Sequence, residues 1–260
     1  MDAVIDIRGV EKRYVGRKGE TVALQKVDLT IDEGEFVAFV GPSGCGKSTL
    51  LNMISGVIEI SSGTIVQEGQ AIRGINRRVG YLTQTDSVLP WRTVEDNVAL
   101  PLEYRGVPRA ERVARVKRML ELVSLEHFAH AFPKELSGGM RKRVALAQML
   151  VYEPKTLLMD EPFGALDAQL KLVMQAELLK IWQSEKKTIV FVTHDLSEAI
   201  AVASRVIVFS GRPGRIKHVE EIAIPYPRDV FKVRFLPEFE RAYESLWQEL
   251  APEIERGEDL

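Results

Sequence analysis

Hydrophobic and polar residues alternate along the first 40 positions with the period of two that is typical of half-buried strands. Glycines separate the runs 4–7, 27–31 and 36–40, which we expect to be strands. From Gly41 the pattern changes to a glycine-rich loop, and 50–54 continues at helical spacing. Short apolar runs predict further strands at 63–66, 79–82, 156–159, 188–192, 205–209 and 215–224.

The middle of the chain changes to the helical period. Val113, Val116 and Leu120 share one face of a segment whose other faces carry arginine and lysine. Because strands resume after this block, we expect a helical subdomain, about 87–152, inserted in a single α/β domain that spans 1–260. The tail, about 225–260, is amphipathic, and we expect it to pack back on the domain through Phe239, Ala242, Leu246 and Leu250.

Composition places the chain among soluble globular proteins, with 45% hydrophobic and 28% charged residues. The 35 basic and 37 acidic residues give a formal net charge of −2, whereas a general nucleic-acid binder usually carries a basic excess. The single cysteine excludes an intramolecular disulfide framework and a multi-cysteine zinc site. The first residues lack the pattern of a signal peptide, and no apolar run approaches about 18 residues, so we expect no membrane span.

Residues 41–48 fit the phosphate-loop pattern of glycine, four residues, glycine, lysine and serine or threonine. Small residues let successive backbone N–H groups turn toward an anion, and the following helix directs its positive end at it. A glycine turn explains the glycines alone, but the strand before and the helix after favour nucleotide binding. Lys47 is expected on the β- and γ-phosphates and the Ser48 hydroxyl on Mg²⁺. The predicted nucleotide-binding residues are Gly41, Pro42, Ser43, Gly44, Cys45, Gly46, Lys47, Ser48 and Thr49.

An apolar strand at 156–159 leads into two carboxylates, Asp160 and Glu161. Many buried strands end in an acid, so this pattern alone is weak. A Mg–nucleotide complex, however, needs an acidic partner opposite the lysine. We expect Asp160 to hold Mg²⁺ through water and Glu161 to act as general base on the attacking water.

Ser137, Gly138 and Gly139 precede a predicted helix at 141–152. Such a sequence is an ordinary helix N-cap. It is also a second helix start rich in free N–H groups, in a chain that already has a phosphate loop. Since one triphosphate needs only one, we expect this segment to complete the site of another copy of the chain.

In this order the motifs resemble the ATP-binding cassette (ABC) family, over about residues 3–225. Tyr14 matches the aromatic residue that stacks on adenine, and Gln84 matches the glutamine loop, which joins the catalytic core to the helical insertion. The remaining matches are 136–140 with the signature segment, 165–167 with the D-loop and His194 with the switch histidine.

The resemblance implies an α/β P-loop NTPase fold, with a RecA-like core, an antiparallel β subdomain and a helical insertion. It implies an ATPase that uses ATP and Mg²⁺. In this family two cassettes pack head to tail, and each ATP lies between one phosphate loop and the partner's signature segment. The implied catalytic residues are Glu161, His194, Gln84 and Lys47, and the implied metal-binding residues are Ser48, Gln84 and Asp160.

The partners implied by the family are a second copy of the chain, transmembrane permease subunits docked near Gln84 and Trp91, and indirectly a solute-binding protein. No nucleic acid is expected, and the chain is expected on the cytoplasmic side of the cell membrane. The stretches 87–94 and 209–216 are similar to importer cassettes for nitrate, taurine, alkanesulfonates and related small anions. This similarity favours a small anion as the transported solute.

Three positions depart from the family pattern. Met140 replaces the commoner glutamine of the signature segment, and Lys142 and Gln148 stand where glutamine and arginine are usual.

Two rival functions are less well supported. A soluble ABC protein acting on nucleic acid or ribosomes usually has paired cassettes, long coiled-coil or zinc insertions, or basic arms, but this chain has one cassette, one cysteine and a net charge of −2. A module that holds ATP without hydrolysis would have lost Glu161 or His194, and both are present.

Four weaker features have simple interpretations. His127 and His130 are three residues apart, but no ligand spacing completes a metal site, which favours surface or packing histidines. The basic positions between 105 and 118 favour a solvated helix face. Trp91 is either a core residue or an anchor for a partner. Cys45 is a small loop residue whose position suggests a thiol probe of nucleotide binding.

Overall fold

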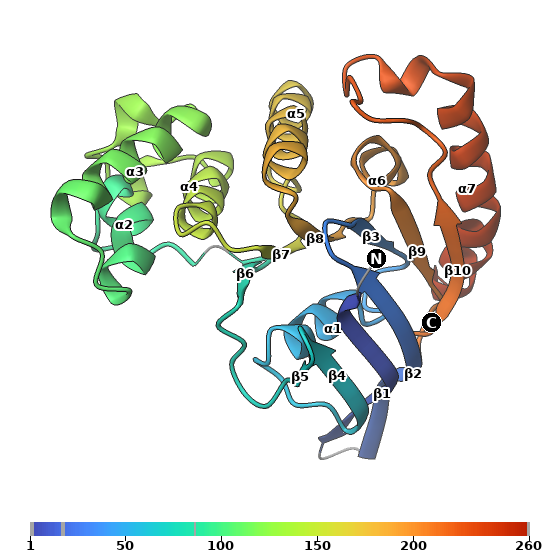
Figure 1. The fold of residues 1–260 in the computed structure, drawn as a ribbon. Helices are drawn as coiled ribbons and strands as arrows, with labels where there is room; N and C mark the ends of the chain where they lie inside the picture. The colour runs from blue at the N-terminus through green and yellow to red at the C-terminus, as the bar shows by residue number, and fades with distance from the viewer. Residues whose placement is uncertain (1–2, 17–18, 86, 259–260) are drawn as a thin grey trace.

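The computed structural model describes residues 3–16, 19–85 and 87–258, so residues 1–2 and 259–260 of the predicted domain lie outside it (Figure 1). In the described residues the larger sheet has six strands in the order β10-β9-β3-β8-β7-β6, parallel except for β10. They are β3 (Phe36–Val40), β6 (Val79–Leu82), β7 (Thr156–Asp160), β8 (Thr188–Val192), β9 (Arg205–Phe209) and β10 (Ile216–Glu221). Strands β3, β7 and β8 are buried throughout, which explains their uninterrupted apolar sequences.

Three helices follow the central strands. Helix α1 (Lys47–Ile54) follows β3, α5 (Ala168–Glu185) follows β7, and α6 (Leu196–Val202) follows β8. Because these strands are parallel, the loops at their carboxyl ends meet at one edge of the sheet. The phosphate loop, the acidic pair and His194 all lie in these loops or at these strand ends.

The smaller sheet is antiparallel, with the order β2-β1-β4-β5. Its strands are β1 (Ala3–Gly16), β2 (Gly19–Asp32), β4 (Ser62–Gln67) and β5 (Gln70–Ala71). The first two are much longer than the runs 4–7 and 27–31 that the sequence predicts. Residues 13–16 of β1 and 19–21 of β2 are all exposed, so these ends of the two strands lack an apolar alternation. The buried face of this sheet packs with residues of α1 and β3 in one core cluster.

The helical block lies to one side of the sheets (Figure 1). It contains α2 (Val94–Tyr104), α3 (Arg109–Leu122), α4 (Gly138–Leu150) and the 3₁₀ turns Glu126–Phe128 and Pro133–Glu135. Val116 and Leu120 of the predicted apolar face are buried, but Val113 is 62% exposed, so the buried stripe of α3 is shorter than expected.

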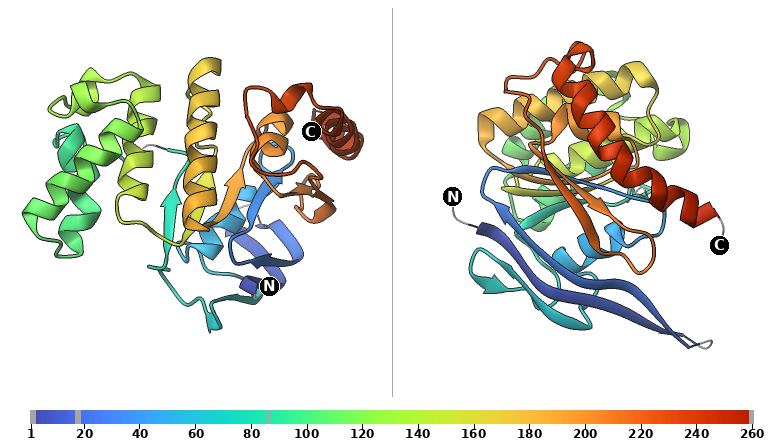
Figure 2. Two further views of the ribbon diagram at one scale, coloured as in Figure 1. Left: turned by 45° about the horizontal axis from the view of Figure 1, so that its top comes forward. Right: turned by 90° about the vertical axis from the view of Figure 1, so that its right-hand side faces the viewer.

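The chain ends in the 3₁₀ turn Val233–Phe235 and the helix α7 (Pro237–Glu258). Figure 2 shows α7 crossing beside β9, β10 and α6, which it contacts. Phe239, Ala242, Leu246 and Leu250 are buried, as the amphipathic pattern predicts. In the part of the chain that the structure describes, no helix has both the length and the apolar character needed to cross a bilayer.

Candidate functional site

The phosphate loop joins the end of β3 to the start of α1. Gly44 and Gly46 have φ of 70° and 106°, a left-handed backbone that glycine adopts without strain. A Cβ on Gly46 would lie 2.7 Å from Leu24 Cδ2, so a larger residue does not fit. The buried Lys47 Nζ donates to the carbonyl oxygens of Gly41 and Pro42 at 2.7 and 2.8 Å, which holds the ammonium group within the loop.

Ser48, at the start of α1, contacts Asp160, at the end of β7. The Ser48 hydroxyl donates to Asp160 Oδ1 at 3.0 Å. Burial raises the pKa of Asp160, the Ser48 hydrogen bond opposes this shift, and the neighbouring Glu161 charge adds to it. A cation bound beside Asp160 would favour the ionised carboxylate. Among the described residues, no cluster of three or more acidic, histidine or cysteine side chains could hold a metal ion.

Glu161 lies between two further polar side chains. Gln84 Nε2 donates to Glu161 Oε2 at 3.4 Å, and His194 Nδ1 lies 3.5 Å from Oε1. The backbone of Glu161 has φ 48°, which is uncommon for a residue other than glycine. Its N–H donates to Val192 O at 3.0 Å, which ties the end of β7 to the end of β8. The structure thus brings together three predicted site residues from distant parts of the chain.

A pocket of about 490 Å³ lies between Tyr14, the phosphate loop and the Gln84–Glu161 pair. Within the described residues, the predicted site residues that do not line it include Gly41, Pro42, Cys45, Asp160 and His194. The predicted residues that do line it are Tyr14, Ser43, Gly44, Gly46, Lys47, Ser48, Thr49, Gln84 and Glu161. Three more were not predicted: Thr21, Ala23 and Arg212. Thr21 pairs directly with Tyr14 in the β1–β2 ladder, so knowledge of the hairpin register would have identified it. Arg212 comes from the turn after β9, within the stretch 209–216 that is similar to importer cassettes, but that similarity gave it no role at the site.

Ser137, Gly138 and Gly139 lie apart from this pocket. Ser137 is the N-cap of α4, and its side chain accepts a hydrogen bond from Met140 N–H at 3.2 Å. Within the described residues, none of the three lines the pocket. A Cβ on Gly139 would lie 3.2 Å from Ala165 O, so the signature segment packs against the D-loop. One copy of the chain therefore does not join its signature segment to its own phosphate loop.

The structure gives a role to Lys142, whose effect the sequence did not indicate. The buried Lys142 Nζ donates to the carbonyl oxygens of Thr83 and Gln84 at 2.8 and 2.9 Å. The lysine thereby ties α4 to the segment that carries Gln84. Met140 packs, half-buried, against the larger core cluster, but nothing in the described residues explains why methionine stands at 140 or glutamine at 148.

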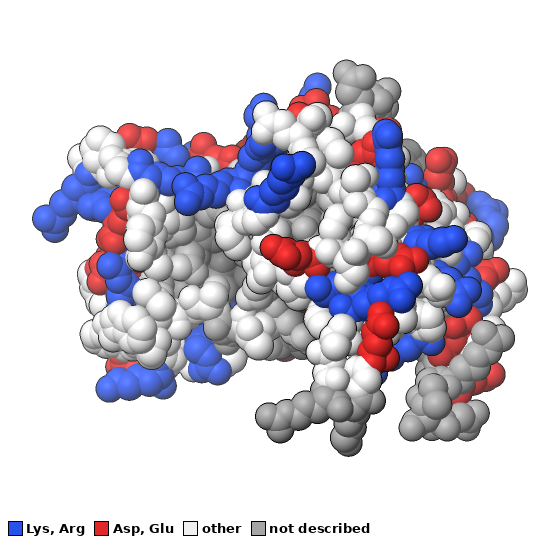
Figure 3. Space-filling view, turned by 90° about the horizontal axis from the view of Figure 1, so that it is seen from below, with Lys and Arg blue, Asp and Glu red and all other residues white. Residues whose placement is uncertain are grey.

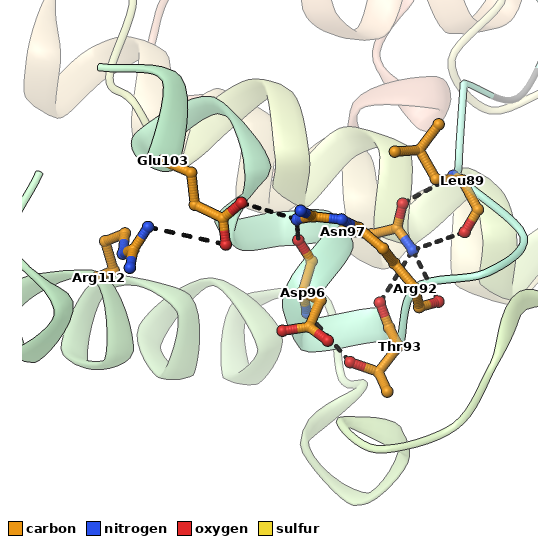
Figure 4. A network of polar contacts seen from close by, with 7 residues as sticks. All are labelled: Leu89, Arg92, Thr93, Asp96, Asn97, Glu103 and Arg112. Carbon is orange, nitrogen blue, oxygen red and sulfur yellow. Dashed lines mark hydrogen bonds and ion pairs between the residues drawn. The ribbon is translucent and has the colours of Figure 1, made fainter. Parts of the chain in front are cut away.

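The segment 88–93 is held by one buried side chain, Asn97 (Figure 4). Asn97 Nδ2 donates to the carbonyl oxygens of Leu89, Arg92 and Thr93, and its Oδ1 accepts from Leu89 N–H at 2.7 Å. The side chain of Trp91, within this fixed segment, is 71% exposed. The structure therefore excludes the interpretation of Trp91 as a core residue and leaves the interpretation as an anchor for a partner.

The weaker features are at the surface. His127 and His130 are exposed, and His130 Nδ1 lies 2.9 Å from Glu95 Oε1. In the basic helix α3, Arg115 pairs with Glu111 at 2.7 Å, as a solvated face would. Lys and Arg side chains also stand among Asp and Glu on the face shown in Figure 3.

Cys45 differs from the expectation. It is fully buried, and Lys47 Nζ donates to its Sγ at 3.5 Å. The expected use of this thiol as a probe is wrong, because packing already shields it from a reagent.

Comparisons with known proteins agree on the family. The model of the ABC transporter family matches residues 24–164. The chain is similar to the taurine import ATP-binding protein of Rhizobium johnstonii, with 49% identity over 204 residues, 78% of each chain. It is similar to the nitrate import ATP-binding protein of Synechocystis sp., with 43% identity over 242 residues, 90% of each chain. It also resembles a dimeric structure of the post-hydrolysis state of an ATP-binding cassette bound to ADP and Pi, with a TM-score of 0.79 and 32% identity, over 85% of this chain and 100% of that one.

Proposed function

Since the chain belongs to the ABC transporter family, we propose that it is the ATP-hydrolysing subunit of an importer for a small anion, and that the residues around the pocket carry out the hydrolysis. The observation that carries the assignment of the site is the convergence of Ser48, Asp160 and Glu161 beside the phosphate loop.

In this proposal the nucleotide occupies the pocket between Tyr14 and Lys47. The aromatic ring of Tyr14 stacks on adenine, and the backbone N–H groups of 41–49 and the positive end of α1 bind the phosphates. Lys47 has to exchange its hydrogen bonds to Gly41 O and Pro42 O for phosphate oxygens. This exchange is favourable because a charge-assisted hydrogen bond to an anion is stronger than one to a neutral carbonyl.

Ser48 and Asp160 fit a magnesium site. Their oxygens are 3.0 Å apart, and Mg²⁺ prefers a hydroxyl or carboxylate together with water and phosphate oxygens. The ion would neutralise charge on the β- and γ-phosphates. A cation would also keep the buried Asp160 ionised, against the raised pKa that burial gives it. Gln84 is the third proposed ligand of Mg²⁺. In this structure its side-chain Nε2 donates a hydrogen bond to Glu161.

Glu161 is the proposed general base. Its two carboxylate oxygens face Gln84 and His194, so the carboxylate is oriented between the glutamine loop and the end of β8. His194 is exposed and is proposed to hold the γ-phosphate. Because the base has a fixed backbone at the end of β7, small movements of Gln84 or His194 would change its orientation.

A second copy is proposed to complete each site. The separation of Ser137, Gly138 and Gly139 from the pocket supports this, because α4 begins with N–H groups that suit the γ-phosphate of a partner's nucleotide. The dimeric assembly of the similar cassette supports the same arrangement.

The permease is proposed to dock at the segment 88–93, where Trp91 is exposed. The chain would then lie on the cytoplasmic side of the cell membrane, with a solute-binding protein on the other side selecting the solute. Small anions are the proposed solutes because the similar proteins are named for import of nitrate and of taurine. These names do not favour a soluble ABC ATPase acting on nucleic acid or ribosomes.

The test is ATP hydrolysis by the chain reconstituted in proteoliposomes with its cognate permease and solute-binding protein. Nitrate, an alkanesulfonate or taurine, a zwitterion that carries a sulfonate group, should stimulate hydrolysis, and solutes without an anionic group should not. The Glu161→Gln variant should bind ATP and lose hydrolysis by about 100-fold or more, because the amide cannot accept the proton. Stimulation only by solutes without an anionic group would reject the proposed class of solute, and normal hydrolysis by the variant would reject Glu161 as the base.

A further inference from the structure

A second cationic side chain, Arg212, lines the nucleotide pocket in addition to Lys47. It belongs to the turn between β9 and β10, and its Nε donates to Gly44 O at 2.7 Å. A Cβ on Gly44 would overlap the Arg212 guanidinium. The side chain therefore lies directly on the phosphate loop, 168 positions away in sequence from the residue that it contacts.

The Arg212 guanidinium retains free donors. Its Nε bonds to Gly44, and within the described parts of the chain no carboxylate forms an ion pair with it. Arg118, which is also exposed, is by contrast paired, with its guanidinium 2.8 Å from Glu153. The planar fork of a guanidinium matches two phosphate oxygens at once. An exposed arginine beside an anion-binding loop is therefore suited to a polyphosphate.

The turn that carries Arg212 is fixed against the site. Gly214 N–H donates to Ala23 O at 3.0 Å, and Gln25 N–H donates to Gly214 O at 3.0 Å. A Cβ on Gly214 would overlap the carbonyl oxygen of Cys45, so the turn also packs on the phosphate loop. Arg212 is thus presented by backbone that contacts both β2 and the loop.

The C-terminal helix holds the other side of the turn. Gly211 N–H donates to Glu253 Oε2 at 2.8 Å, and Lys217 Nζ lies 3.3 Å from Glu253 Oε1. Glu253 is only 5% exposed, although it is charged. A buried carboxylate is stable where it accepts hydrogen bonds, so this contact fixes the residue next to Arg212 in the sequence.

We propose that Arg212 binds the phosphates of the nucleotide, and that Glu253 of α7 is a positioning residue that holds the Arg212 turn in place. The inference rests on the proposed function of this pocket and adds a nucleotide contact to it. The C-terminal helix thereby gains a link to the nucleotide site through a single turn.

The first test measures binding of a fluorescent ATP analogue to the whole chain, with unlabelled ATP, inorganic tripolyphosphate and adenosine as competitors. Arg212→Ala should weaken ATP and tripolyphosphate about tenfold, the effect of a lost hydrogen bond to a charged group, and leave adenosine unchanged. Arg212→Lys should restore part of the loss because it restores the charge. Arg215→Ala is the matched control, because Arg215 is exposed in the same turn but does not line the pocket.

Two results would overturn the phosphate contact. If Arg212→Ala binds ATP like the wild type, Arg212 does not touch the nucleotide. If it weakens adenosine as much as tripolyphosphate, the substitution disturbs the whole pocket and Arg212 makes no selective contact with the phosphates. Lys47→Ala, measured in parallel, separates the two proposals. Loss of ATP binding with Lys47→Ala but not with Arg212→Ala rejects the inference alone, whereas a wild-type chain that binds no ATP rejects the proposed site itself.

The second test concerns Glu253. Glu253→Ala should reproduce the loss of tripolyphosphate affinity, and Glu253→Gln should restore most of it, because an amide oxygen still accepts from Gly211 N–H. A merely structural role would instead lower the melting temperature of both variants without a selective effect on tripolyphosphate. Equal affinities in wild type and Glu253→Ala would reject the positioning role.

Discussion

Replacement of Trp91 by alanine tests the proposed docking of the permease. The indole is 71% exposed, and the segment that carries it is held by Asn97 through backbone contacts that the substitution does not alter. The isolated chain should therefore keep its stability within about 0.5 kcal/mol, as is usual for surface substitutions. It should also keep ATP binding and basal hydrolysis, since Trp91 does not line the nucleotide pocket.

The expected effect on docking follows from the exposed area. A tryptophan side chain buries up to about 250 Å², so the exposed part of Trp91 is roughly 180 Å². At about 25 cal/mol per Å² its complete burial would contribute up to about 4.5 kcal/mol. Because binding also costs ordering and desolvation, truncation of such an anchor is expected to cost about 2 kcal/mol, or roughly 30-fold in affinity.

The assay is capture of the chain by its detergent-solubilised permease over a range of concentrations, beside a thermal melt. Phe235→Ala is the matched control, because Phe235 is 79% exposed and lies near α7, away from the helical block. Trp91→Ala should shift half-maximal capture about 30-fold, and Phe235→Ala should not. If Trp91→Ala melts several degrees lower and is captured normally, the docking role of this segment is wrong.

Two further predictions concern the nucleotide site. Lys47→Ala should weaken ATP binding more than adenosine binding, whereas Tyr14→Ala should weaken both, because stacking does not depend on phosphate. Calorimetric titration with ATP and with adenosine measures these losses. Equal losses for the two ligands in the lysine variant would contradict the assignment of Lys47 to the phosphates. Asp160→Asn should abolish Mg²⁺-dependent hydrolysis without lowering the melting temperature of the nucleotide-free chain. Burial raises the pKa of Asp160, so its stabilising contribution is present at low pH and is lost as the pH rises through that pKa. The asparagine does not titrate, so the melting temperature of the variant minus that of the wild type should increase from acid to neutral pH. A difference that stays constant with pH would argue against a raised pKa of Asp160.

Local patterns predicted much of the fold because they report local conformation. The buried strands β3, β7 and β8 are continuous apolar runs with few alternative structures, and the phosphate loop is a contiguous segment whose glycines specify its backbone. The lengths of β1 and β2 were less predictable, because their exposed ends, 13–16 and 19–21, pair through backbone groups and carry little apolar pattern.

By itself the sequence determined which residue types the site contains: a phosphate loop, an acidic pair, a glutamine and a histidine. Only the tertiary structure decided which side chains meet. Arg212 on Gly44, Glu253 on Gly211 and Lys142 on Gln84 join positions that are far apart in the chain. Likewise, the exposure of Trp91 and the burial of Cys45 depend on how whole elements pack. Such contacts arise from the relative placement of strands and helices, which no short stretch of sequence contains.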